Sequence, residues 1–211
     1  MSITFLIEII GTVAFAISGV RMAGRRDYDL FGGFVLAWVT AVGGGTLRDV
    51  MLGQIPFWIT SPIYLICTFL ALILVQIFAR LIDKMNTAWI FFDTLGLALF
   101  TIAGIQKTLI CGQPMWVAIM MGCITGVAGG VIRDVLASIP PVICQKDIYA
   151  MSSILGGCVY AALLQFSLDS WVISMITFLF ITIVRLLGLR YNIALPKIRI
   201  SEEKKDKPQE E

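Results

Sequence analysis

Histidine is absent from this chain of 211 residues, and charged residues make up only 14% of it. Without histidine, the chain lacks the side chain that proteins use most often as a general base, a proton relay and a transition-metal ligand. A soluble domain carries about 25% charged residues, whereas this chain is 58% hydrophobic and has a mean hydropathy of +0.90. The composition therefore predicts a protein of the lipid bilayer. It argues against an enzyme, since we also identify no pair of a nucleophile and a base.

Paired cysteines of the C-x-x-C type are absent too. Of the five cysteines, Cys67, Cys123 and Cys158 fall inside apolar runs, where cysteine usually behaves as a small hydrophobic residue. We therefore expect no disulfide framework, no resident metal and no cofactor. The net charge of +2 does not indicate a nucleic-acid partner, because the basic residues lie mostly at the ends of apolar runs and in the C-terminal tail.

Seven apolar stretches are long enough to cross a bilayer, which takes about 20 mostly apolar residues in a helix. They cover residues 3–20, 30–52, 62–80, 88–106, 114–138, 147–167 and 170–188. The predicted fold class is an all-α membrane protein with seven transmembrane helices. The first stretch has no basic residue before it, so we interpret it as a retained helix rather than a secretory signal. Residues 197–211 are expected to form a charged, disordered tail.

Lysine and arginine predict the orientation, because cytoplasmic loops are rich in these two residues. Basic residues gather in the first, third and fifth loops and at the C-terminal end, while the alternate loops contain only Lys107. This distribution predicts an N-terminus outside and a C-terminus in the cytoplasm.

An internal repeat relates two parts of the chain at a shift of 85 residues. The segment G-G-T-L-R-D-V at 44–50 aligns with G-G-V-I-R-D-V at 129–135, and Pro56 aligns with Pro141. Each copy holds three spans, and an odd number means that the second copy enters the membrane from the opposite face. We therefore predict an inverted 3+3 repeat plus a seventh helix. The boundaries are 1–87 for the first repeat, 88–168 for the second, 169–190 for the seventh helix and 191–211 for a cytoplasmic charged tail.

Glycines gather in the second and fifth spans, and they allow two interpretations. Small residues let helices approach closely in lipid. Alternatively, the glycines break the helices and expose backbone carbonyls to a cation. Such irregular backbone is tolerated in a membrane only where it is buried in protein or lines a cavity. We favour the second interpretation, since the glycines recur in both copies and each set precedes an Arg-Asp pair. Glycines that face a continuous polar path would support a pore at these helices, whereas glycines that face lipid or a packed neighbour would contradict the pore assignment. The expected path residues are Gly43, Gly44, Gly45, Thr46, Gly129 and Gly130.

The two Arg-Asp pairs are expected at opposite mouths of such a path. At 1.5 Å per residue, Arg48 lies roughly 27 Å from the start of its span, near the end of a hydrocarbon core about 30 Å thick. Arg133 lies in a span of the opposite direction. We interpret Arg48, Asp49, Arg133 and Asp134 as gate or mouth charges; the alternative is arginines that reach the lipid headgroups. Weaker candidates, which either support the path or serve only their own helices, are Glu8, Asp93, Ser18, Thr40 and Thr125.

The two motifs, G-G-G-T-L-R-D at 43–49 and G-G-V-I-R-D at 129–134, resemble those of the trimeric intracellular cation channel (TRIC) superfamily. The chain looks most like the bacterial branch, which is also described as glycine-transporter-like, and the resemblance covers residues 3–188. It implies a homotrimer in a bacterial inner membrane, with one pore per protomer between kinked second and fifth helices. Glycine breaks would expose carbonyls to transient potassium or sodium, and Arg48 and Arg133 would be gate-like. The lysine-rich phosphoinositide-binding stretch of animal members has no match.

The predicted function is a passive monovalent cation channel, with potassium as the expected ion. The alternative is a secondary transporter of glycine or another small amino acid, because inverted repeats and broken helices also serve alternating access. Helix ends and arginines would then hold the substrate carboxylate.

Overall fold

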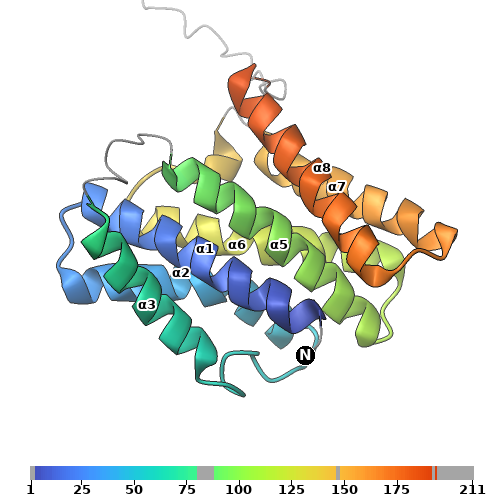
Figure 1. Ribbon diagram of the computed structural model, residues 1–211, viewed down its shortest axis with the longest axis horizontal. Helices are drawn as coiled ribbons and strands as arrows, with labels where there is room; N and C mark the ends of the chain where they lie inside the picture. Colours follow the sequence, from blue (N-terminus) through green and yellow to red (C-terminus); the bar gives the residue numbers. More distant parts are fainter. Residues whose placement is uncertain (1–2, 80–87, 146–147, 192, 194–211) are drawn as a thin grey trace, which may run out of the picture.

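The computed structural model describes residues 3–79, 88–145, 148–191 and 193, and the regular secondary structure in these ranges is helical throughout (Figure 1). The α-helices are α1 (Ile3–Arg25), α2 (Leu30–Met51), α3 (Ile63–Ile77), α5 (Ala88–Ile110), α6 (Met115–Leu136), α7 (Tyr149–Leu163) and α8 (Ser170–Arg190). Two short 3₁₀ helices, η1 (Val142–Cys144) and η2 (Leu164–Phe166), precede and follow α7.

Within the described ranges, six helical segments are long and apolar enough to cross a membrane, and α3 is a shorter apolar helix of 15 residues. The predicted membrane class is confirmed, and each predicted span coincides with one helix. The main differences are at the ends: α1 and α5 continue to Arg25 and Ile110, whereas α3 ends at Ile77. The end of the third predicted span at residue 80 and the predicted tail at 197–211 lie outside the described residues.

Four helices form the centre of the molecule: α1, α2, α5 and α6 contact one another in pairs. Helix α3 lies against α1 and α2 on one side, and α7 and α8 lie together on the other side (Figure 1). Large apolar side chains remain exposed on the peripheral helices, among them Phe69 on α3 and Leu179 on α8. Exposed apolar surface of this kind is what a lipid-facing helix requires.

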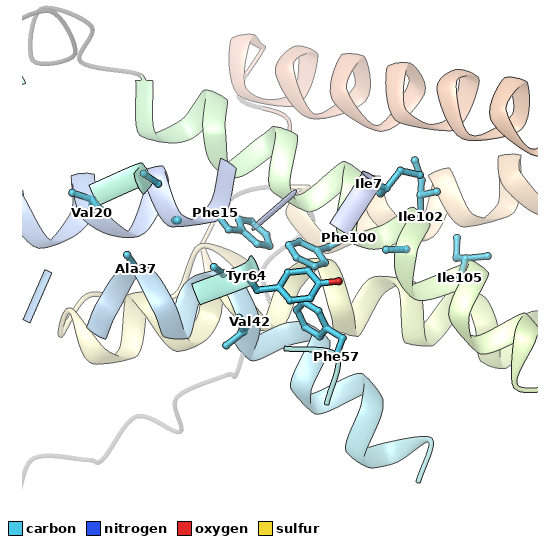
Figure 2. Close-up of a cluster of buried hydrophobic side chains, with 14 of the residues drawn as sticks. Ile7, Phe15, Val20, Ala37, Val42, Phe57, Tyr64, Phe100, Ile102 and Ile105 are labelled. Carbon is cyan, nitrogen blue, oxygen red and sulfur yellow. The ribbon is translucent and has the colours of Figure 1, made fainter. Parts of the chain in front are cut away.

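The contact between α1 and α5 is built from a glycine and a phenylalanine of each helix. Gly11 faces the ring of Phe100, and Gly96 faces the ring of Phe15. The two rings stack on each other with centroids 5.3 Å apart (Figure 2). Because the lower-numbered residue of α1 meets the higher-numbered residue of α5, the two helices run antiparallel.

Helices α2 and α6 correct one expectation. We expected each to break at its glycines, but α2 is continuous from Leu30 to Met51 and α6 from Met115 to Leu136. Consecutive glycines lower helix propensity by about 1 kcal/mol each relative to alanine, yet here the neighbouring helices hold the backbone in place. The predicted glycine breaks are therefore wrong.

Candidate functional site

The closest approach of α2 and α6 takes place at matched glycines. A Cβ atom on Gly44 would overlap the backbone carbonyl oxygen of Thr125, and a Cβ atom on Gly129 would overlap that of Thr40. Only glycine fits at either position, since a carbonyl group of the neighbouring backbone cannot move aside. The pairing of 44 with 125 and of 40 with 129 means that α2 and α6 run antiparallel.

The remaining glycines of the two motifs also face packed neighbours. A Cβ atom on Gly43 would lie 2.9 Å from Cδ1 of Ile132, and Gly45 meets the ring of Phe57. A Cβ atom on Gly130 would lie 2.8 Å from the hydroxyl oxygen of Tyr149. The close-packing interpretation therefore describes these glycines in this structure, and a polar path along them does not.

The threonines near the crossing bond to their own helices. Thr40 donates to the carbonyl of Leu36 at 2.6 Å, and Thr125 donates to the carbonyl of Met121 at 2.5 Å. Thr46 donates to its own helix as well and accepts a hydrogen bond from the Trp58 indole. The hydroxyl groups of Thr40 and Thr125 bond within their own helices, which was one of their two expected roles. Thr46 was expected along the path, and its hydroxyl bonds instead within α2 and to Trp58.

The Arg48 cluster lies beyond the crossing, near the C-terminal end of α2. Arg48 Nε donates to Asp49 Oδ1 at 2.7 Å, and Arg48 Nη2 donates to Glu8 Oε1 of α1 at 3.2 Å. The second carboxylate oxygen of Asp49 accepts the backbone amide of Phe57 at 2.8 Å. Arg48 and Asp49 are both fully buried. A buried charge of this kind persists only when it is paired and hydrogen-bonded.

Two further side chains complete the Arg48 cluster. Lys107, at the end of α5, places Nζ 2.9 Å from Asp49 Oδ1, and a quarter of its side chain is exposed. Tyr64 of α3 donates its hydroxyl to Glu8 Oε2 at 3.0 Å. Among the described residues, the cluster thus contains two cations and two carboxylates, so its formal charges balance.

The Arg133 cluster repeats this arrangement near the C-terminal end of α6. Arg133 donates to Asp134 Oδ1 through Nε at 2.9 Å and through Nη2 at 2.8 Å. Its Nη1 lies 2.5 Å from both Asp93 Oδ1 of α5 and Ser18 Oγ of α1. The second oxygen of Asp134 accepts the backbone amide of Val142 at 3.0 Å. Arg133 and Asp134 are fully buried.

The two clusters correspond residue by residue at the shift of 85. The matched pairs are Glu8 and Asp93, Arg48 and Arg133, Asp49 and Asp134, Phe57 and Val142, and Tyr64 and Tyr149. They differ in their additional groups, since Lys107 matches Met22, and Ser18 matches Ala103. They differ also in the tyrosines, because the Tyr149 hydroxyl has no hydrogen-bond partner among the described residues.

The burial of the arginines changes their interpretation. Neither reaches lipid headgroups, and neither presents its charge at an open mouth, because both side chains have an exposed fraction of 0%. Arg48 binds acids of the first repeat, and Arg133 binds acids of the second. Because α2 and α6 run antiparallel, the two clusters lie at opposite ends of their crossing.

Some residues of the clusters were missed or underrated from the sequence. Glu8 and Asp93 looked like helix-dipole carboxylates, but they are direct partners of the arginines. Tyr64 and Tyr149 were not singled out, although they match at the same shift as the arginines, and Lys107 was considered only for the orientation of the chain. Within the described ranges, no three cysteine, aspartate or glutamate side chains are grouped so that they could hold a metal ion.

Comparison with known proteins gives consistent matches. The family model described as glycine transporter matches residues 5–80 and again residues 90–165, so its two matches begin 85 residues apart. A UPF0126 membrane protein of Vibrio cholerae is 39% identical over 205 residues, which cover 95% of this chain and 85% of that protein. The UPF0126 inner membrane protein YadS of Escherichia coli is 39% identical over 206 residues, which cover 95% and 98%.

Solved structures of the same fold are also known. The TRIC trimeric intracellular cation channel orthologue from Rhodobacter sphaeroides matches with a TM-score of 0.86 at 31% sequence identity. The match covers 92% of this chain and 100% of that one. These relatives are described as membrane proteins and channels, not as enzymes.

Proposed function

The chain belongs to the bacterial TRIC-like family of membrane proteins, whose sequence model is described as glycine transporter, and from this premise we propose that it is a passive channel for monovalent cations. The observation that carries the proposal is the match to the Rhodobacter sphaeroides cation channel orthologue over 92% of this chain at 31% identity. Potassium is the expected ion, and sodium is expected to pass as well.

The proposed path runs between α2 and α6 within each protomer. In the present arrangement the two helices touch at Gly44 and Gly129, so the proposed channel would be closed in this arrangement. Opening has to separate the helices at these glycines. The carbonyl groups of Thr40 and Thr125, which now face the glycines, would then face the path and replace part of the hydration shell of a cation.

The two charge clusters are proposed to close the ends of this path. Charged residues inside a membrane usually mark an ion pathway or a switch, because burying them there is costly. Arg48 and Arg133 are held by acids from two helices each, so their positions depend on how α1, α2, α5 and α6 are packed. A change in that packing would move both arginines, which suits a gate.

We also propose the topology and assembly. The antiparallel contacts of α1 with α5 and of α2 with α6 support an inverted 3+3 repeat, with α8 outside it. The distribution of lysine and arginine supports an N-terminus outside and a C-terminus in the cytoplasm, in a bacterial inner membrane. By analogy with the trimeric orthologue, the chain is proposed to form a homotrimer.

The second candidate function is transport of glycine or another small amino acid, which the description of the family model favours. Reconstitution into liposomes separates the two functions. A channel gives potassium efflux driven by a gradient alone, with no uptake of radiolabelled glycine above that of protein-free liposomes. Saturable glycine uptake without potassium efflux would replace the channel by the transporter. Valinomycin, added last, checks that the vesicles still hold potassium.

A further inference from the structure

The C-terminal ends of α2 and α6 are capped in the same way. After α2, the amide of Gln54 donates to the carbonyl of Asp49 at 2.8 Å, and Gly53 has a positive φ of 66°. After α6, the amide of Ile139 donates to the carbonyl of Asp134 at 3.0 Å, and Ser138 has a φ of 53°. These positions match at the shift of 85, so each helix end stabilises itself by the same local bonds.

The α6 end has an additional attachment to the segment that follows α1. The hydroxyl of Tyr28 donates to the carbonyl of Leu136 at 2.8 Å, and Arg26 Nη2 donates to the carbonyl of Ser138 at 3.2 Å. The last carbonyls of a helix have no partner within it. The Tyr28 bond satisfies one of them, that of Leu136, and the Arg26 bond holds the carbonyl of Ser138 just beyond the helix end. The attachment joins the first repeat to the second, across 108 and 112 residues of sequence.

The repeat offers no equivalent pair of donors for the α2 end. Tyr28 matches Gln113, and Arg26 matches Cys111. A thiol is a weak donor, and neither matched residue has the phenol or the guanidinium group of its counterpart. The two ends of the α2–α6 pair are therefore chemically different, although their own caps are alike.

The same segment also reaches the Arg133 cluster through an aromatic ring. The guanidinium carbon of Arg25 lies 5.6 Å from the centroid of Trp89, and that of Arg133 lies 5.6 Å from the same centroid. Trp89 thus contacts a cation of the α1 end and the buried cation of the cluster, within the range of a cation–π interaction.

We propose that Arg26 and Tyr28 form a latch, which holds the last turn of α6 and keeps the Arg133 end of the path closed. The proposal rests on the proposed channel function. Both latch bonds lie in an exposed part of the molecule, where hydrogen bonds compete with water and contribute little net stability. A contact of this strength breaks readily. Arg26 and Tyr28 are positioning residues that act through α6, and their release opens this end.

The test compares the double variant Arg26→Met, Tyr28→Phe with the parent in full-length protein. The first readout is potassium efflux from liposomes, and we expect a several-fold rise. The second readout is deuterium uptake of the backbone, which does not depend on channel activity. Uptake is expected to rise at residues 134–139 and to stay unchanged at residues 49–54, the equivalent helix end without the latch. When Arg26 is replaced by Lys instead of Met, the rise in efflux and in uptake is expected to be smaller, because lysine can still donate to a carbonyl.

The matched control is the double variant Arg190→Met, Tyr191→Phe, which removes the same groups from an exposed site at the end of α8. It should behave like the parent in both readouts. Unchanged uptake at 134–139 in the latch variant overturns the latch, whether or not the protein conducts. Raised uptake with unchanged efflux in a conducting protein also overturns it. A parent without potassium efflux refutes the channel function instead.

Discussion

Gly44 of α2 packs against the backbone carbonyl group of Thr125 on α6, and no side chain fits between them. The contact recurs 85 residues on, where Gly129 of α6 packs against the carbonyl group of Thr40 on α2. The two contacts are reciprocal, because each helix supplies one glycine and one carbonyl. Together they bring the backbones of α2 and α6 to their closest approach.

We expect Gly44→Ala to destabilise the protein, since the added methyl group overlaps a backbone oxygen that cannot rotate away. Overpacking of this kind costs about 1–3 kcal/mol or more. Thermal unfolding of the detergent-solubilised protein, followed by fluorescence-detected size exclusion, measures the effect. Gly24→Ala is the matched control, because Gly24 is also helical but has no heavy atom within 4 Å of an added Cβ. That variant should be neutral or gain up to about 1 kcal/mol from helix propensity. Equal midpoints for the two variants would contradict the close crossing.

The matched tyrosines predict unequal effects from the same chemical change. Tyr64→Phe removes a hydrogen bond to Glu8 Oε2 and should lower the stability by about 1 kcal/mol. Tyr149→Phe removes a buried hydroxyl that has no hydrogen-bond partner among the described residues, so its midpoint should stay the same or rise. The comparison uses the same unfolding assay, and each variant is the control of the other. A larger loss at position 149 than at position 64 would show that the clusters are bonded differently.

Replacement of either buried arginine should impair folding as well as function. Arg48→Met leaves Glu8 and Asp49 without their main cation in a buried site, and removal of one partner of a buried ion pair costs about 3–5 kcal/mol. An arginine at the mouth of a path, as Arg48 was interpreted from the sequence, would instead affect conductance and leave the fold intact. The yield of folded protein and its unfolding midpoint check the revised expectation. If Arg48→Met is as stable as the parent, Arg48 is not paired as described.

A second change tests whether lost charge balance is the reason. Combining Arg48→Met with Glu8→Gln removes one unpaired carboxylate, so the double variant should lose less stability than the sum of the single losses. Additive losses would point to packing rather than charge.

The helices could be predicted from the sequence because each is a long apolar run, and the length of such a run is a local property. The repeat could be predicted as well, since Arg48 and Arg133 follow glycines at the same spacing. What the glycines face could not be predicted, because a helix break and a close crossing require the same small residues. The difference lies in the carbonyl of Thr125, which is distant in the sequence.

The partners of the arginines show the same limit. Glu8 lies 40 residues before Arg48, and Asp93 lies 40 residues before Arg133, so only the packing of α1 on α2 and of α5 on α6 reveals either pair. A matched acid within a membrane span was a usable signal, because a buried carboxylate requires a partner. Tyr64 and Tyr149 carried no comparable signal, since tyrosine is common at the ends of membrane helices.

Lys107 distinguishes the Arg48 end of the proposed path. Its ammonium group lies 2.9 Å from Asp49 Oδ1 and is partly exposed, so it stands where a cation from solution would first meet that carboxylate. Lys107→Met should therefore raise potassium efflux from liposomes, because it leaves the cluster with one cation for two carboxylates. Stability should fall less than for Arg48→Met, because Asp49 keeps its ion pair with Arg48. Lys107→Arg keeps the charge and should resemble the parent, and Arg190→Met should show that loss of an exposed cation elsewhere has no effect. Efflux from Lys107→Met equal to that of a conducting parent would mean that the ammonium group does not restrict the path, and that Lys107 serves only to neutralise Asp49.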